Sequence, residues 1–350
     1  MTTDQRAALV SRNTAEVVTP PELLALLDNE KQPKAYIGFE PSGFVHVALG
    51  FLTAAKVRDL VEAGFDTTIL LADWHAQIND KFGGDLGKIR ACGEYFQDAF
   101  HALGVPESVR FRTASELVAE PAYWEDVIRV SKHSTVARIK RAMTIMGRKE
   151  EDAEQDAAKL IYPAMQVTDI HRLDLDLAYG GMDQRHAHML YRDLQKRLGW
   201  KPVVAVHTPL LSGLKGGGRM DSPVSKMSKS DPESAVFIHD SAAAVPKKIE
   251  KAFCPPKQVD GNPVLDLARH VLLPRGSVKV ERPAKFGGDA EYRDWALLQK
   301  DYADGKLHPA DLKRTVAAAV SQLLLPVHRY FGTKSENLRR LQEITGLTFP

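Results

Sequence analysis

Two lysines and two serines stand close together in the stretch Lys226-Met227-Ser228-Lys229-Ser230. Glycines at positions 213, 216, 217 and 218 precede it and Asp231-Pro232 follows it, which predicts a loop that can close over a ligand. Ammonium and hydroxyl groups at this spacing suit the oxygens of a polyphosphate. Closure would bring Lys226 and Lys229 to negative charge that develops during a reaction. A solvated surface loop is the alternative interpretation.

A second group of polar side chains is spaced along a predicted helix. Tyr162, Gln166 and Asp169 fall at i, i+4 and i+7, so they share one helix face. A solvent-facing stripe on an amphipathic helix would have the same spacing. The next predicted strand ends in Gly180-Gly181, a glycine turn typical of a ligand-facing strand end, and this favours a binding role.

The scaffold for these residues is predicted to be a parallel sheet. Residues 35–40 and 67–72 have strand patterns, and residues 49–61 between them have helical spacing, which together make a βαβ unit. The first turn of this unit stands at a helix N-terminus, where backbone N–H groups favour an anion. His46 could contact that anion, or it could simply cap the helix.

Further along the chain the same pattern repeats. Residues 109–112, 175–179 and 202–206 are predicted strands, residues 86–103 and 184–198 are predicted helices, and residues 235–238 are predicted to form a last short strand. Residues 5–28 have the pattern of a helical lead-in. We therefore expect an α/β fold with a doubly wound parallel sheet (Rossmann-type) in residues 1–235, with a helical insertion at about 121–161 and the lysine loop at about 213–232. A smaller, mostly α-helical domain would follow in residues 236–350.

Composition limits the class of protein. With 350 residues, 44% hydrophobic and 26% charged, the chain can bury a large core. No apolar run approaches the roughly 18 residues that span a bilayer, and the N-terminus lacks a signal-peptide pattern, so we expect a cytoplasmic protein without a membrane segment. The only cysteines, Cys92 and Cys254, lack zinc spacing, and no metal site is predicted.

Charge is distributed unevenly although the net charge is only +2. Residues 241–350 contain 18 Lys and Arg against 12 Asp and Glu, whereas residues 1–240 contain 29 against 33. A basic C-terminal third is typical of a nucleic-acid contact surface. A solvated helical face of Lys and Arg would give the same imbalance.

Several motifs in order resemble those of the archaeal and eukaryotic type of tyrosyl-tRNA synthetase, a class I aminoacyl-tRNA synthetase family. The resemblance runs from about residue 33 to 330, and the lysine stretch matches the class I signature. It implies that ATP and L-tyrosine form tyrosyl-adenylate, from which tyrosine passes to tRNA(Tyr), with Mg²⁺ accompanying ATP. The matching pieces are residues 36–43, 71–76, 162–169, 180–184, 226–230, 286–289 and 308–313.

The resemblance also assigns roles to residues. Tyr36 and Asp169 would hold the phenolic hydroxyl of tyrosine, Tyr162 and Gln166 its ammonium group, and Gln184 would lie near its carboxylate, with Ala72 and His75 lining the pocket. ATP would contact Asp183 through its ribose. The triphosphate and its surroundings would involve Gly43, His46, Gly50, Lys226, Ser228 and Lys229, of which His46, Lys226 and Lys229 would act in catalysis. Only the first histidine of the usual His-x-Gly-His signature is present, at His46.

Contacts with tRNA and with a second subunit follow from the same resemblance. Arg141 and Arg185 would lie near the acceptor end of tRNA, and Phe286, His308 and Asp311 would read the anticodon. A carboxylate at Asp311 accepts hydrogen bonds from guanine but not from adenine N1, which favours guanine at the first anticodon position. We also expect a homodimer, with the apolar helices between Trp124 and Met146 at the interface.

Two other functions have to be weighed. Tryptophanyl-tRNA synthetase shares the fold and a similar lysine loop, but a Tyr36 and Asp169 pair suits a phenol oxygen better than an indole N–H. A non-catalytic RNA-binding or signalling paralogue would have little reason to keep both loop lysines. Pyrophosphate exchange with tyrosine, tryptophan and phenylalanine would separate the three.

Overall fold

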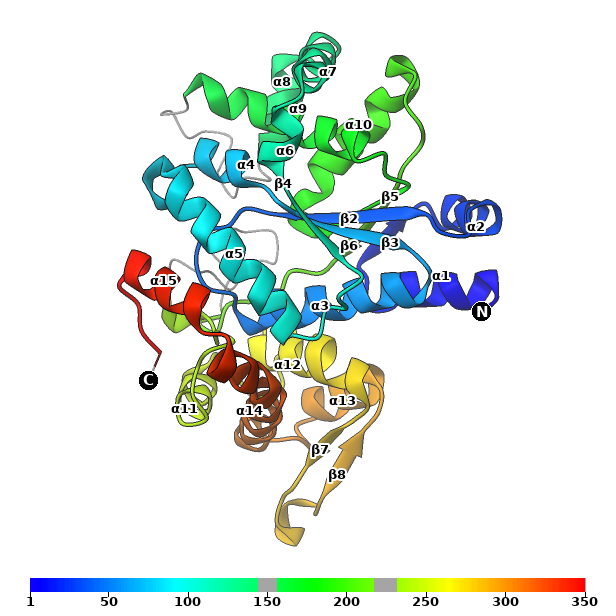
Figure 1. Ribbon diagram of the computed structural model, residues 1–350. Coiled ribbons are helices and arrows are strands. Elements are labelled where there is room, and N and C mark those ends of the chain that lie inside the picture. Colours follow the sequence, from blue (N-terminus) through cyan, green and yellow to red (C-terminus); the bar gives the residue numbers. More distant parts are fainter. Residues whose placement is uncertain (144–155, 217–231, 350) are drawn as a thin grey trace. The chain divides into compact units, whose positions relative to one another are not determined.

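The computed structural model describes residues 1–143, 156–216 and 232–349 of the chain (Figure 1). Contacts divide the chain into two compact units. The domain boundary expected at residue 235 lies inside unit 2, which also includes two short segments from earlier in the chain. Unit 1 consists of Met1–Ser42, Ala55–Gln97 and Val105–Pro209, and unit 2 of Gly43–Ala54, Asp98–Gly104 and Leu210–Pro350.

Unit 1 is built on a six-stranded sheet with the strand order β1-β6-β5-β2-β3-β4. Every neighbouring pair is parallel except the edge pair of β1 and β6. The strand order reverses between β5 and β2, so the sheet is doubly wound, as predicted. The strands are β1 (Glu16–Val18), β2 (Lys34–Phe39), β3 (Asp66–Leu71), β4 (Arg110–Thr113), β5 (Leu177–Gly181) and β6 (Val204–Thr208).

Helices cover both faces of this sheet. In Figure 1, α9 and α10 lie on one face, and α1 with the second half of α3 lies on the other. Helices α7 and α8 occupy the region of the predicted insertion. The helices are α1 (Thr3–Ser11), α2 (Pro20–Asn29), α4 (Asp73–Ile78), α6 (Ala114–Val118), α7 (Pro121–Lys132), α8 (Val136–Ala142), α9 (Ala157–Arg172) and α10 (Arg185–Leu198), together with α3 (Val47–Glu62) and α5 (Leu86–Ala102), which contribute to both units.

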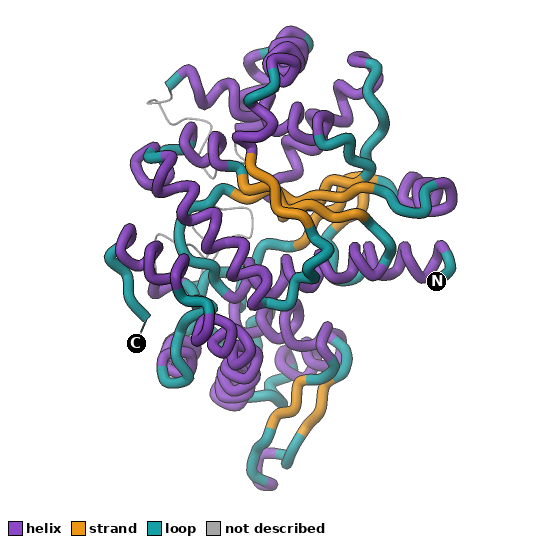
Figure 2. The backbone as a smooth tube through the Cα atoms, viewed as in Figure 1, coloured by secondary structure: helices purple, strands orange, loops and turns teal. Residues whose placement is uncertain are grey.

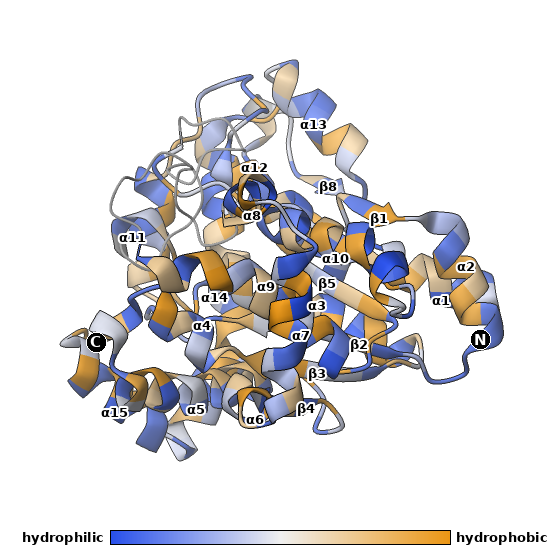
Figure 3. Cartoon of the chain, turned by 90° about the horizontal axis from the view of Figure 1, so that it is seen from above, coloured by the Kyte–Doolittle hydropathy of each residue, from blue (hydrophilic) through white to orange (hydrophobic). Residues whose placement is uncertain are grey.

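Local sequence explains where several of these helices begin and end. Thr19 and Thr113 each form a capping box with a glutamate three residues later, which satisfies two free N–H groups at the helix start. Gly199 follows α10 with a φ of 69°, a left-handed conformation that suits glycine. The inner faces are apolar, and Figure 3 shows hydrophobic and hydrophilic residues alternating along α7.

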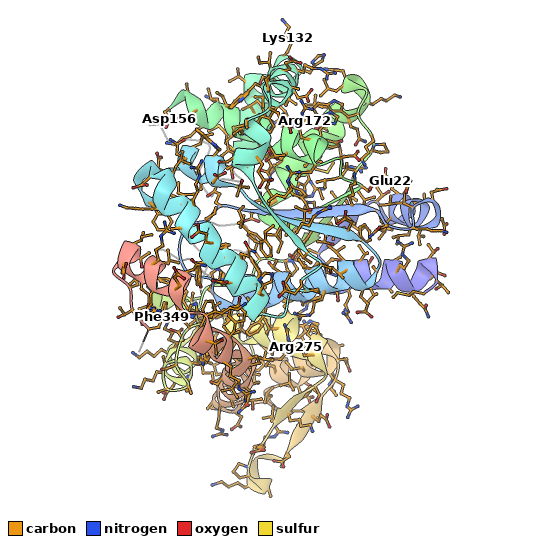
Figure 4. All side chains as sticks on the ribbon, in the orientation of Figure 1. Glu22, Lys132, Asp156, Arg172, Arg275 and Phe349 are labelled. Carbon is orange, nitrogen blue, oxygen red and sulfur yellow. The ribbon has the colours of Figure 1, made fainter. Side chains whose placement is uncertain are left out.

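Unit 2 is mainly helical. Its helices pack through buried leucines and valines of α12 and α14, and Phe349 (labelled in Figure 4) packs edge-on against Phe44 with ring centroids 4.8 Å apart. Two short antiparallel strands run side by side in the same unit (Figure 2). The elements are α11 (Ala244–Lys251), α12 (Pro263–Leu267), α13 (Trp295–Ala303), α14 (Pro309–Thr333) and α15 (Glu336–Thr345), with strands β7 (Val278–Val280) and β8 (Ala290–Tyr292).

The structure corrects the sequence interpretation in two places. The strand predicted at residues 235–238 is an isolated bridge between Phe237 and His46, held by backbone hydrogen bonds to residues 45 and 47. The predicted helical lead-in contains strand β1. Both segments are short and pair with distant parts of the chain, so neither shows a periodic pattern. The C-terminal region is mostly helical, as predicted, and includes the short β7–β8 pair.

Candidate active site

The carboxyl end of the sheet in unit 1 brings together side chains from several strands and helices. Tyr36 of β2 pairs in register with Ala178 of β5, at the point where the strand order reverses. Chain segments leaving β2, β3 and β5 carry Glu40, Ala72 and Asp183. In open α/β sheets this reversal point is where ligands bind, because the loops leave it in opposite directions.

Helix α9 crosses this end of the sheet and turns its polar stripe inward. Asp156 caps its start by accepting from the N–H of Lys159 at 3.2 Å, and Arg172 ends it (both labelled in Figure 4). Tyr162 and Asp169 are buried and Gln166 is half-buried. The alternative of a solvent-facing stripe is therefore wrong.

Asp169 stands at the centre of the stripe and only 1% of it is exposed. The hydroxyl of Tyr123 donates to Oδ1 at 2.8 Å, and His75 Nε2 lies 3.1 Å from Oδ2. Neither ring nitrogen of His75 forms an aligned hydrogen bond with a described residue, and its contact with Asp169 is an ion pair when His75 is protonated. A carboxylate has about four acceptor sites, so Asp169 can still accept from a ligand.

The buried groups around Asp169 shift one another's titration. Burial, followed by the charge of Asp169, raises the pKa of Tyr36, while a hydrogen bond with Gln166 opposes the change. Burial and Asp169 likewise raise the pKa of Tyr123. For His75, burial lowers the pKa, but Asp169 and nearby carboxylates outweigh it, so the pKa ends above its usual value.

Glu40 forms the other end of the site. Its carboxylate accepts from the hydroxyl of Tyr162 at 2.6 Å and from Asn79 Nδ2 at 3.0 Å, and Lys81 Nζ lies 3.4 Å away. The ring of Tyr162 packs edge-on against His75, with centroids 4.9 Å apart. Asp169 and Glu40 are thus joined through His75 and Tyr162 in one buried set of contacts.

Gln166 links this set to the glycine-rich end of β5. Its Nε2 donates to Gln184 Oε1 at 3.0 Å, whereas its own buried Oε1 has no hydrogen-bond partner among the described residues. A buried carbonyl oxygen without a donor has acceptor capacity for a ligand group or a water molecule. Gly180 packs tightly here, because a Cβ at this position would lie 2.8 Å from the Cβ of Gln184.

Two buried histidines lie behind Tyr36 and Gly180. His188 Nδ1 and His207 Nε2 are 2.9 Å apart, and His207 Nδ1 lies 2.8 Å from Glu16 Oε1 on edge strand β1. Burial lowers the pKa of both histidines. Arg185 Nε donates to the same glutamate oxygen at 2.5 Å, which ties the start of α10 to the sheet edge.

The residues expected at an ATP site fall into separate parts of the structure. Asp183 belongs to unit 1, in the helical turn Met182–Gln184 that follows β5. Gly43, His46 and Gly50 belong to unit 2, where His46 Nδ1 accepts from the N–H of Leu49 at 3.2 Å at the start of α3. A Cβ on Gly50 would lie 2.8 Å from Leu103, so close packing requires glycine there. Lys226, Ser228 and Lys229 lie outside the described residues.

The residues expected to contact tRNA are also divided. Arg141 is exposed at the end of α8, and Arg185 is paired with Glu16. In unit 2, His308 caps α14 by accepting from the N–H of Ala310 at 3.2 Å, and Asp311 in the first turn pairs with Arg314.

Phe286 belongs to the turn that links β7 to β8, and its side chain lies outside the described part. Arg282 ties this turn to the segment before α14, because it donates to the carbonyls of Gly288 and Lys306 at 2.6 and 2.5 Å.

Sequence reasoning missed several members of the site. Glu40 was visible as a carboxylate at a strand end, next to the anion-favouring turn, but its partner Tyr162 is 122 residues away. Tyr123 was read only as part of a helical insertion, and Asn79 and the histidine pair gave no periodic signal. Each contact joins distant segments, so only the folded chain brings them together.

Comparisons with known proteins agree with this geometry. Residues 28–325 match the sequence profile of the tRNA synthetases class I (W and Y). The tyrosine–tRNA ligase of Aeropyrum pernix is 51% identical over an alignment that covers 98% of this chain and 97% of that protein. The chain belongs to the tyrosyl-tRNA synthetases. Synthetases use ATP as a substrate, together with the amino acid and tRNA.

Solved structures of the family superpose over nearly the whole chain. The crystal structure of the Aeropyrum pernix tyrosyl-tRNA synthetase gives a TM-score of 0.89 at 46% identity and covers 99% of each chain. The Pyrococcus horikoshii synthetase, solved in complex with L-tyrosine, gives 0.90 at 40% identity and covers 98% of this chain and 100% of its own. The Giardia lamblia tryptophanyl-tRNA synthetase gives 0.68 at 17% identity, which shows only a shared fold.

Two further findings concern the described residues of the synthetase. No helix among them is long and apolar enough to cross a membrane. Within the same residues, no three or more His, Cys, Asp and Glu side chains are grouped so that they could hold a metal ion.

Proposed function

We propose that the buried site of unit 1 is where this synthetase binds L-tyrosine for attachment to tRNA(Tyr). The observation that carries the proposal is Asp169, a buried carboxylate held by Tyr123 and His75 that retains acceptor capacity beside the hydroxyl of Tyr36. The phenol of tyrosine donates to Asp169 and accepts from Tyr36. A buried pair of this kind rejects a ring without a hydroxyl, because its polar groups would be left unpaired.

The ammonium group of tyrosine binds at the opposite end of the site. The carboxylate of Glu40, the hydroxyl of Tyr162 and the unpartnered Oε1 of Gln166 offer the negative or acceptor groups that an ammonium requires. Gln184 lies next to Gln166 and faces the carboxylate that reacts. Ala72 and His75 close the side of the pocket between the two ends.

The reaction then proceeds in two steps. An oxygen of the tyrosine carboxylate attacks the α-phosphorus of ATP in line, the bond to the β-phosphate oxygen breaks, and pyrophosphate leaves. A hydroxyl of the terminal tRNA ribose next attacks the carbonyl carbon of tyrosyl-adenylate and AMP leaves. The enzyme accelerates the reaction by orienting the substrates and by stabilising the charge that develops, and no side chain acts as a nucleophile.

Residues for ATP follow from the motifs. Asp183 holds the ribose, and ATP enters as its magnesium complex. His46, Lys226 and Lys229 stabilise the pyrophosphate as it leaves, with Ser228 and the backbone at Gly43 and Gly50 close to the nucleotide. Lysines suit this role because their point charges act on phosphate without a fixed geometry.

Transfer RNA would meet both units, with Arg141 and Arg185 near the acceptor end and Phe286, His308 and Asp311 at the anticodon. We place the reaction in the cytoplasm.

A homodimer would cover Trp124, Ile128 and Val136, which are 41%, 68% and 66% exposed on α7 and α8. Sedimentation at micromolar concentration tests the dimer, and a stable, active monomer would contradict it.

Amino-acid-dependent pyrophosphate exchange tests the central proposal. Purified, folded protein with ATP should exchange labelled pyrophosphate in the presence of tyrosine, and far less with tryptophan or phenylalanine. Exchange that is fastest with tryptophan would instead indicate a tryptophanyl-tRNA synthetase. No exchange with any amino acid would leave only a non-catalytic paralogue.

A further inference from the structure

Tyr123 contacts the proposed phenol-binding group from outside the Rossmann-type core. It lies on α7, in the helical insertion, and is completely buried. Its hydroxyl donates to Asp169 Oδ1 at 2.8 Å and lies 3.3 Å from the carbonyl oxygen of Met165, one turn earlier on α9. The contact joins residues 46 positions apart.

Tyr123 donates a hydrogen bond to only one of the two oxygens of Asp169. The direction of the remaining acceptor sites therefore depends on how the carboxylate is rotated. The plane of a carboxylate turns easily about its last side-chain torsion unless its oxygens are held. Tyr123 holds Oδ1 from α7, and His75 approaches Oδ2 from α4. Two contacts from two helices fix the rotation of the group, so its remaining acceptor sites keep one direction.

The hydroxyl of Tyr123 is suited to this task because it remains a donor. Burial and the neighbouring carboxylate raise its pKa, so it keeps its proton over the working range of the enzyme. The ring is fixed as well, since it packs edge-on against Trp124 with centroids 5.6 Å apart. A rigid donor on a rigid helix positions its acceptor more accurately than a flexible side chain would.

We infer that Tyr123 is a positioning residue that sets the specificity for tyrosine, by holding Asp169 so that its free acceptor site faces the incoming phenol. The inference rests on the proposed binding of the phenol to Asp169. Tyr123 acts through Asp169 and does not itself contact the substrate. The helical insertion therefore contributes to amino-acid selection as well as to the surface of the protein.

Tyr123→Phe is the first variant to measure, because it removes one oxygen and leaves the ring. The kcat/KM ratio for tyrosine over phenylalanine in pyrophosphate exchange should fall by about 10- to 100-fold, the usual effect of a hydrogen bond to a charged group. The loss should appear mainly in KM for tyrosine, with kcat little changed.

Tyr191→Phe is the matched control. Tyr191 is also buried, in the same apolar cluster of unit 1, but its hydroxyl donates to the carbonyl oxygen of Lys201 at 3.0 Å. Tyr191→Phe should lower the melting temperature about as much as Tyr123→Phe does, and it should leave the kcat/KM ratio for tyrosine over phenylalanine unchanged. Exchange is measured well below the melting temperature of the less stable variant, so that both enzymes are folded.

A double-mutant cycle shows whether the effect passes through Asp169. In an Asp169→Ala background, Tyr123→Phe should change the remaining ratio by less than about twofold, because residue 169 then has no oxygen for Tyr123 to hold. The inference would be overturned if Tyr123→Phe lowered the kcat/KM ratio equally in wild type and in the Asp169 variant. It would also be overturned if Tyr123→Phe alone left that ratio unchanged. If wild-type protein shows no tyrosine-dependent exchange, the proposed function itself fails.

Discussion

The proposed tyrosine site of unit 1 and the proposed anticodon residues at the start of α14 in unit 2 differ in how their side chains are held. In the pocket, Asp169 and Glu40 are paired with side chains from distant parts of the chain. At α14, Asp311 pairs with Arg314 three residues away, and His308 caps its own helix. Long-range pairing fixes a group before the ligand arrives, whereas the side chain of Asp311, 14% exposed, is held by an arginine that is 65% exposed and that must move before the carboxylate can contact RNA.

This difference predicts unequal selectivity. A buried polar group that loses its ligand has no water to replace it, so a wrong amino acid leaves it unsatisfied. A carboxylate such as Asp311 that misses its base can pair again with its exposed arginine at little loss. The proposed tyrosine site should therefore discriminate far more strongly than the anticodon residues.

Asp169→Ala should abolish most of the preference for tyrosine over phenylalanine. Discrimination of about 10⁴- to 10⁵-fold is a magnitude known for tyrosyl-tRNA synthetases rather than one that follows from this structure. The kcat/KM ratio from pyrophosphate exchange measures it. Asp126→Ala is the control, because Asp126 is another buried carboxylate of unit 1 whose partners are Arg129 and Arg172. Equal ratios in wild type and Asp169→Ala would show that the phenol binds elsewhere.

Glu40→Gln should raise KM for tyrosine by about 10- to 100-fold, because the side chain keeps its shape and loses the charge that faces the ammonium. The amide of the variant would present N–H donors as well as an acceptor oxygen to Asn79 and Tyr162, which now both donate to the carboxylate. Glu22→Gln, at the exposed pair with Arg192, should leave KM unchanged. A normal KM in Glu40→Gln would place the ammonium elsewhere in the site.

Asp311→Ala should reduce aminoacylation of tRNA with guanine at the first anticodon position by about 10-fold, within the 1–3 kcal/mol typical of single-base recognition. Tyrosyl-adenylate formation should be normal, because Asp311 belongs to the other unit. Asp304→Ala, at an exposed carboxylate paired with Lys300, is the control. Full preference for guanine in Asp311→Ala would exclude this residue from anticodon reading.

The smallest effect should be a pH dependence of stability that comes from His75. Its pKa in the folded protein lies above the ordinary value of 6.5, so the folded state holds this proton more tightly than the unfolded state. The resulting stability is complete below pH 6.5 and is lost as pH rises through the folded pKa. Urea unfolding of wild type and His75→Gln should therefore show a difference in the free energy of unfolding that shrinks over this range. A constant difference would mean that His75 does not bind the proton more tightly when folded.

The pH dependence of stability expected from His188, which also belongs to unit 1, has the opposite sign. Burial lowers its pKa, so its contribution to stability is lost as pH falls from 6.5 towards the folded value. The difference in the free energy of unfolding between wild type and His188→Gln should therefore shrink as pH falls. The difference between wild type and His75→Gln should shrink as pH rises. The two variants together separate a histidine that faces a carboxylate from one that faces another histidine.

Most of the sheet could be predicted from the sequence, because its strands and helices are long enough to show a period. Strand β2 was predicted at residues 35–40 and is found at Lys34–Phe39, and helix α10 ends at Gly199 as expected. Strands β1, β7 and β8 have three residues each, too few for a period. The partner of β1 is β6, far along the chain, so local sequence could not reveal that pairing either.

The site shows the same limit more sharply. Spacing alone placed Tyr162, Gln166 and Asp169 on one helix face, and the family resemblance supplied Tyr36 and Gln184. Neither could reveal that Tyr162 is held by Glu40, or that Asp169 is held by Tyr123, because these contacts depend on where α7 and the end of β2 meet α9. A residue's chemistry can be read locally, but its partners cannot.

The close packing at Gly180 has a consequence for how this enzyme can change. Any side chain at position 180 would collide with Gln184, whose amide is held by Gln166. A mutation there would displace Gln184 and its contact with Gln166, so we expect it to be tolerated only together with a change at position 184. Laboratory evolution towards bulkier tyrosine analogues should therefore leave residue 180 untouched and gather its substitutions at the opposite wall, around His75 and Ala72.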